Sequence, residues 1–284
     1  MGKLLIPIDF SAYSDVALKY AAQVALDAGQ ELELIHVFSE HSNNLINVQD
    51  AAPLQDPRIP EARQQMENCI ASLQAEFPSL SIQGTFKDGN LYDELKNATS
   101  SSAYDAIVMG TKGSSGLEAV FIGSNTYDTI LNTQTPVLAV PLESTKYKKQ
   151  KIALLCNFKE GEISALNQAV PLFKTDFQLI LVHVNDKDRA IKDIDADFKL
   201  WIHRIETELN ISDISYIIKP QTLFMGRRES VAQGITTVLL DEQADILILT
   251  KSKKNVFRQL TESNVIKKLA FSIQIPTFFA RVLS

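Results

Sequence analysis

Cysteine is scarce in this sequence, and so are the long apolar runs that cross membranes. The only cysteines among 284 residues are Cys69 and Cys156, which excludes a disulfide framework and a cysteine-rich metal site. No apolar run approaches the length that spans a bilayer, and the chain begins in a strand pattern without the charged and apolar regions of a signal peptide. We therefore expect a cytoplasmic protein with no membrane contact.

An excess of basic residues is also missing. The 28 basic residues are outnumbered by 34 acidic ones, for a net charge of -6, which disfavours a general electrostatic grip on nucleic acid or anionic lipid. The densest basic stretch, Lys146 to Lys151, is interpreted as a solvated linker. The length suits one large or two modest domains, and 45% hydrophobic residues are ample for buried cores.

No arrangement of residue types stands out as a catalytic unit or a metal site. Ordered Ser/His/Asp residues and paired carboxylates are not apparent, so we assign no catalytic and no metal-binding residue. His36 and His183 occupy matching strand patterns between apolar neighbours. We interpret both as satisfied core or strand-edge histidines.

Strand and helix patterns alternate through the first half of the chain. Strands are predicted at 3–8, 31–38, 80–86, 106–109 and 136–140, and helices at 14–27, 61–77, 89–100 and 125–132. The polar segment 39–60, which contains three prolines, predicts a long surface loop. Alternating strands and helices call for a parallel sheet covered on both faces, with ligands at the carboxyl ends of the strands.

A glycine-punctuated loop follows the fourth predicted strand. Gly110, Gly113 and Gly116 remove side chains where a backbone turns or approaches a ligand, and Ser114 and Ser115 add small hydroxyl groups. Farther on, the pair Gly123-Ser124 precedes the predicted helix 125–132, and Ser124 is the predicted N-cap. The unpaired amides of such a helix end suit a phosphate. The loop is neither a Walker loop nor a G-x-G-x-x-G fingerprint.

The spacing Gly110-x2-Gly113-x9-Gly123-Ser124, between two strands, resembles the nucleotide-binding signature of the universal stress protein family. The opening KLLIPIDFS of Lys3 to Ser11 resembles that family's first strand, which ends in an aspartate. The one departure is Asn125, where the family usually has a small apolar residue. The resemblance implies an open, mainly parallel α/β sheet of the Rossmann-like, adenine nucleotide alpha hydrolase-like type.

By the same resemblance, the Asp9 carboxylate would accept hydrogen bonds from a ribose hydroxyl or an adenine edge. The Val37 backbone would meet the adenine edge, and Pro7 would line the pocket. The full set of residues expected to bind the nucleotide is Pro7, Asp9, Val37, Met109, Gly110, Thr111, Lys112, Gly113, Ser114, Ser115, Gly116, Gly123, Ser124, Asn125 and Thr126.

Structural interpretations of the same residues stay open. Asp9 could instead form a turn or cap a helix. The glycines could serve turn geometry or close helix-to-sheet packing without a ligand. Lys112 could pair with a phosphate, but a lone loop lysine is usually solvated.

The order of elements repeats after residue 142. KIALLCNF at 151–158 aligns with KLLIPIDF at 3–10, which sets Asn157 against Asp9, and FQLILVHV at 177–184 sets His183 against His36. DILIL at 245–249 aligns with the strand before Gly110. We predict two tandem universal stress domains, residues 1–145 and 150–284, each with a five-stranded sheet.

The binding loop is not preserved in the second copy. Gly110 faces Thr250, Gly113 faces Lys253, and Gly123 faces about Ser263. Side chains therefore stand where the first copy has none, and Asn157 lacks the charge of Asp9. We expect a degenerate second site.

These observations favour an ATP-binding module of the stress response, in which ATP, with or without Mg²⁺, orders loops that protein partners then read. The alternatives are a slow ATP hydrolase at the same site and a nucleotide-free interaction scaffold. In universal stress proteins the last strands commonly meet across a two-fold axis. A tandem chain can form that contact internally as an intrachain pseudo-dimer, and can still form a homodimer through another face.

Overall fold

The structure is a computed structural model, and it describes residues 2–38, 58–101, 104–112, 122–185, 189–220, 231–251 and 274–281. The first half contains β1 (Lys3–Pro7), α1 (Ala12–Ala28), β2 (Glu31–Phe38), α2 (Arg58–Glu76), β3 (Ile82–Asp88), α3 (Leu91–Ser101), β4 (Ala106–Gly110), α4 (Ser124–Asn132) and β5 (Val137–Val140). The second half contains β6 (Lys151–Leu155), α5 (Glu160–Phe173), β7 (Gln178–Asn185), α6 (Ile191–Leu209), β8 (Ile214–Pro220), α8 (Val231–Asp241), β9 (Ile246–Lys251) and β10 (Thr277–Arg281).

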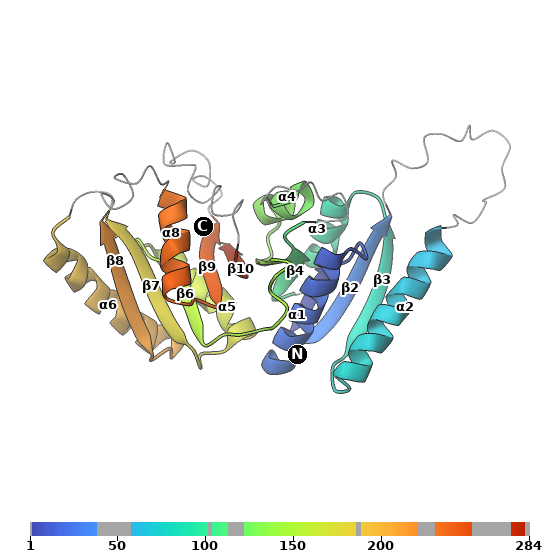
Figure 1. The fold of residues 1–284 in the computed structure, drawn as a ribbon, viewed down its shortest axis with the longest axis horizontal. Coiled ribbons are helices and arrows are strands. Elements are labelled where there is room, and N and C mark those ends of the chain that lie inside the picture. Colours follow the sequence, from blue (N-terminus) through green and yellow to red (C-terminus); the bar gives the residue numbers. More distant parts are fainter. Residues whose placement is uncertain are drawn as a thin grey trace.

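All ten of these strands form one sheet in the order β3-β2-β1-β4-β5-β10-β9-β6-β7-β8. Every pair is parallel except β5 with β10, which are antiparallel. The predicted α/β class and mainly parallel sheet are therefore confirmed. The two five-stranded units join edge to edge, and Figure 1 shows them side by side with α2 and α6 at the far ends.

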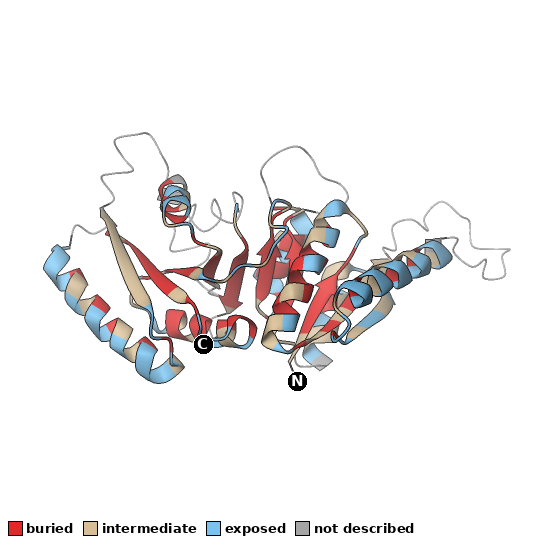
Figure 2. Ribbon diagram, turned by 60° about the horizontal axis from the view of Figure 1, so that its bottom comes forward, coloured by how far each residue is buried: buried red, intermediate tan, exposed pale blue. Residues whose placement is uncertain are grey.

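Helices cover both faces of the sheet, and each face has its own core. On one face, the apolar side chains of α1, α2, α5 and α6 pack together in one buried cluster. On the other face, Leu95 of α3, Ile130 of α4 and Ile235 of α8 pack against the alternate strand residues. The central strands are buried throughout, as the red ribbons in Figure 2 show. Burial on both faces explains why these strands read as continuous apolar runs.

The ends of α1 follow from local sequence. The helix starts after Ser11, whose hydroxyl accepts a hydrogen bond from the Ser14 N–H at 3.3 Å. It ends at Gly29, which has a φ of 74°, a left-handed conformation that glycine adopts without steric cost. The chain can then turn directly into β2, which begins two residues later at Glu31.

The predicted loop 39–60 is too long at its carboxyl end. Residues 58–60 already belong to α2, with Pro60 in the first turn, where the missing proline N–H costs no helical hydrogen bond. Residues 39–57 lie outside the described part of the chain. Among the helices that the structure describes, none combines the length and apolar composition needed to cross a bilayer.

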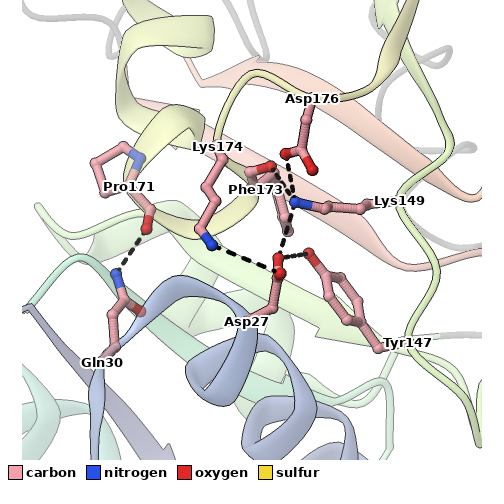
Figure 3. A network of polar contacts seen from close by, with 8 residues as sticks. All are labelled: Asp27, Gln30, Tyr147, Lys149, Pro171, Phe173, Lys174 and Asp176. Carbon is pink, nitrogen blue, oxygen red and sulfur yellow. Dashed lines mark hydrogen bonds and ion pairs between the residues drawn. The ribbon is translucent and has the colours of Figure 1, made fainter.

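The two halves are fixed together by more than the β5–β10 pair. Figure 3 shows Lys149, from the segment between the halves, with its Nζ 2.9 Å from Asp27 Oδ2 of the first half and 2.6 Å from Asp176 Oδ1 of the second. Asp27 also lies 3.7 Å from Lys174 Nζ and accepts a hydrogen bond from the Tyr147 hydroxyl at 3.4 Å. We call these five residues the inter-half network.

The prediction that Lys146 to Lys151 is a solvated linker is therefore wrong for part of that stretch. The Lys149 side chain is 13% exposed, and Lys151 begins β6, where its N–H donates to Asp245 Oδ2 at 3.0 Å. Sequence alone could not show this, because the acidic partners of Lys149 are 122 and 27 residues away along the chain, as the residue numbers of Asp27 and Asp176 give.

Candidate functional site

The carboxyl ends of three neighbouring strands meet at one edge of the first half. β1 lies between β2 and β4, with Pro7 opposite Ile35 and Leu5 opposite Ile107. Asp9 follows the end of β1, Val37 lies one residue before the end of β2, and Gly110 ends β4. The predicted convergence of these three positions is confirmed, whereas their contact with a ligand stays a prediction.

Asp9 forms a turn and still presents its side chain to solvent. The Ser11 N–H donates to Asp9 Oδ1 at 3.1 Å, and Phe10 between them has a φ of 60°. The turn-forming interpretation of Asp9 is therefore correct. It does not exclude the ligand role, because the Asp9 residue is exposed and a carboxylate has acceptor capacity beyond one hydrogen bond.

Gly110 is required by close packing between β4 and α1. A Cβ added at this position would lie 2.7 Å from the Tyr13 backbone oxygen and 2.8 Å from the Tyr13 carbonyl carbon. Both are backbone atoms, so the contact cannot be relieved by a side-chain rotation. Of the two interpretations, close helix-to-sheet packing accounts for Gly110 by itself, and Tyr13 is a site neighbour that periodicity did not reveal.

The two ends of the glycine loop are tied together. The Gly123 N–H donates to Thr111 O at 2.7 Å, and the Thr111 N–H donates to Val140 O at 3.0 Å. The buried Thr126 hydroxyl donates to Gly110 O at 2.8 Å. These bonds hold the first turn of α4 beside the end of β4. The Thr126 hydroxyl donates to a backbone oxygen and so has a structural role.

The predicted N-cap is off by one residue. α4 begins at Ser124, and the N-cap is Gly123, with φ -63° and ψ 153° and no side-chain hydrogen bond. The Gly123 N–H bonds outside the helix, to Thr111 O. Ser124 and Asn125 are consequently exposed in the first helical turn, where the amides without helical partners and the positive end of the dipole favour an anion.

The remaining predicted site residues fall into two groups. Met109 and Pro7 are buried, and Val37 is half-buried against the same core as Met109. Gly113, Ser114, Ser115 and Gly116 lie in 113–121, outside the described residues. In the ranges that the structure describes, no group of three His, Cys, Asp or Glu side chains is placed to hold a metal ion.

The two aligned histidines make the same contact in both halves. His36 Nδ1 lies 2.8 Å from Ile8 O, and His183 Nδ1 lies 2.8 Å from Cys156 O, at the aligned position. Since a carbonyl oxygen only accepts, each imidazole donates there and is held by the strand before it. The prediction of satisfied core or strand-edge histidines is confirmed, and His183 is buried, with 6% exposed.

Comparison with known proteins gives the family. The model of the universal stress protein family matches residues 1–141. The chain belongs to the universal stress protein family. A universal stress protein of Methanocaldococcus jannaschii is 26% identical over 153 residues, which cover 49% of this chain and 93% of the relative. A second one from the same organism is 28% identical over 138 residues, covering 49% of this chain and 81% of the relative.

A solved universal stress protein from Archaeoglobus fulgidus is similar along almost the whole chain. It is 17% identical, has a TM-score of 0.70 and covers 99% of this chain and 96% of its own. At this identity the likeness shows the fold, which is the predicted Rossmann-like α/β fold. The family model ends at residue 141, so the assignment of residues 150–284 as a second universal stress domain stays a prediction.

In the second half of this universal stress protein, a buried glutamate of α5 accepts hydrogen bonds from the turn at Asn157, the residue that aligns with Asp9. Glu162 Oε1 accepts the Asn157 N–H at 2.8 Å, and Glu162 Oε2 accepts the Lys159 N–H at 3.3 Å. Glu162 is 3% exposed. Burial raises the pKa of its carboxyl above the ordinary value of 4.5, although the hydrogen bonds from Asn157, Lys159 and Cys156 oppose the rise.

This raised pKa gives a prediction for stability. Between the unfolded value near 4.5 and the higher folded value, the folded state holds the proton more tightly, so the free energy of unfolding falls as the pH rises. Compared with Glu162→Gln, which cannot ionise, the native chain should lose stability through this window and level off above it. Urea unfolding of both proteins from about pH 4 to pH 8 measures the difference. A difference that grows with pH in favour of the native chain would contradict the assignment.

Proposed function

We propose that the first half of this universal stress protein binds ATP, and that the chain acts as a nucleotide-dependent regulatory module in the cytoplasm. The observation that carries the proposal is the convergence of Asp9, the end of β4 and the first turn of α4 in a member of this family. An exposed carboxylate suits the hydroxyl and amine donors of a nucleoside. A helix N-terminus with small exposed residues suits its phosphates.

The positive charge of a lysine near the site also suits an anionic ligand. Lys112, two residues beyond β4, is half-buried and positively charged, and it follows Thr111, whose carbonyl oxygen accepts a hydrogen bond from the N–H of Gly123, the N-cap of α4. The described residues offer no group of three metal ligands, so Mg²⁺ would reach the site on the phosphate oxygens. In this proposal ATP binds once per chain, because Asn157 and Glu162 replace Asp9 and Ser14 in the second half.

Titration calorimetry with ATP, with and without Mg²⁺, tests the proposal. The native chain should saturate at one ATP per chain. Asp9→Asn, which copies Asn157 and can still accept the Ser11 N–H through its amide oxygen, should weaken ATP binding about tenfold because a hydrogen bond to a charged group is lost. Asp15→Asn is the matched control, since Asp15 is an exposed acid on α1 that pairs with Lys19 and should leave the affinity unchanged.

The other outcomes separate the alternatives. Two ATP molecules per chain would overturn the single-site proposal, and no binding would favour a nucleotide-free scaffold. Release of inorganic phosphate that Asp9→Asn abolishes would favour a hydrolase. Equal losses in Asp9→Asn and Asp15→Asn would show that only net charge matters and would remove Asp9 from the site.

A further inference from the structure

A tyrosine of α1 contacts the only lysine next to β4 in the described part of the loop. The Lys112 ammonium lies 5.8 Å from the centroid of the Tyr13 ring. That distance is within the range of a cation–π interaction. Tyr13 belongs to the first turn of α1, and both residues are half-buried, which limits the screening of the interaction by water.

The position of Tyr13 is fixed by the backbone rather than by its own side chain. Its carbonyl lies over Gly110, so closely that no Cβ fits between them. Lys112 is two residues beyond Gly110, and Thr111 between them is buried and hydrogen-bonded to both Val140 and Gly123. These backbone contacts place Tyr13 and Lys112 near each other, so that the ring and the ammonium group are within reach.

The second half does not repeat this arrangement. In the repeat alignment, Gly161 stands at Tyr13, Thr250 at Gly110 and Ser252 at Lys112. The half predicted to be degenerate has thus lost the aromatic ring and the close packing position, while Ser252 lies between Lys251 and Lys253.

We propose that Tyr13 is a positioning residue that holds the Lys112 ammonium toward the phosphate chain of the adenine nucleotide. This inference rests on the proposed function and goes further, because it assigns the preference for phosphorylated ligands to one pair of residues. The ring restricts the flexible lysine stem before the ligand arrives, so less side-chain entropy is lost on binding. Adenosine, which has no phosphate, gains nothing from the pair.

A double-mutant cycle with two ligands tests the inference. Tyr13→Leu removes the ring and keeps apolar bulk, Tyr13→Phe keeps the ring, and Lys112→Met removes the charge. ATP affinity should fall about threefold in Tyr13→Leu and about tenfold in Lys112→Met, and stay at the native value in Tyr13→Phe. In the Lys112→Met background, Tyr13→Leu should have no further effect on ATP. Adenosine affinity should be the same in all variants.

Each outcome separates this inference from the proposed function. If ATP and adenosine both fail to bind the native chain, the proposed function fails. Tyr13 has only a structural role if the native chain binds ATP but Tyr13→Leu weakens ATP and adenosine equally. The same conclusion follows if Tyr13→Leu weakens ATP binding as much in the Lys112→Met background as in the native one. Loss of ATP binding in Tyr13→Phe would also overturn the inference.

Discussion

Replacing Gly110 by alanine should destabilise the protein by about 2 kcal/mol and weaken ATP binding, although only a methyl group is added. The new Cβ would stand 2.7 Å from Tyr13 O and 2.8 Å from Tyr13 C, which no real Cβ contact tolerates. β4 cannot move away, since it is paired with β1 on one side and β5 on the other. The first turn of α1 must shift instead, and it carries Tyr13. Denaturant unfolding and ATP titration measure the two effects.

Gly84→Ala is the matched control for this prediction. A Cβ at Gly84 would lie 2.9 Å from Met66 Cγ and 3.1 Å from Ile70 Cδ1, which are side-chain atoms rather than backbone atoms, although Met66 is buried. Gly84 is exposed, in the edge strand β3, and alanine loses less backbone entropy than glycine on folding. Gly84→Ala should therefore destabilise the protein less than Gly110→Ala. Equal destabilisation by the two substitutions would show that the contact with the Tyr13 backbone is not what limits Gly110.

The prediction of the fold succeeded where the signal was local or periodic. The strands around the site were predicted within a few residues because a strand buried on both faces reads as a continuous apolar run. The loop after β4 was identified by its glycines, which carry family information in their spacing. The N-cap was missed by one residue, because the local rule favours a serine side chain as the cap, whereas Gly123 takes the position without any side-chain hydrogen bond.

The parts that sequence could not predict are contacts between segments far apart in the chain. Tyr13 reads as one more residue of an amphipathic helix, and only the fold places its backbone on Gly110. Glu162 reads as a first-turn acid, but it is buried and binds the turn at Asn157. The repeat alignment did hold one signal, because both Tyr13 and Gly110 differ in the second half, where Gly161 and Thr250 stand. That signal can be interpreted only once the two positions are known to be in contact.

The inter-half network predicts a large effect of a substitution far from the site. Lys149→Met should lower the free energy of unfolding by about 2 kcal/mol, between the values for exposed and fully buried ion pairs. The Lys149 ammonium contacts Asp27 at 2.9 Å and Asp176 at 2.6 Å, and it also donates to Phe173 O at 3.1 Å. Because Asp27 belongs to α1 and Phe173 to α5, the lysine links the two halves (Figure 3). Urea unfolding measures the loss.

Lys174→Met is the control from the same network. The Lys174 side chain is 51% exposed and its Nζ lies 3.7 Å from Asp27 Oδ1, so its removal should cost less than about 0.5 kcal/mol. Both variants lose one positive charge. A difference between their free energies of unfolding therefore comes from the position of the lysine and not from the net charge. If Lys149→Met unfolds at the same urea concentration as Lys174→Met, the network adds nothing to the joining of the halves. The β5–β10 pair, the packing of α1 on α5 and the hydrogen bond from Gln30 Nε2 to Pro171 O at 2.9 Å would then join them.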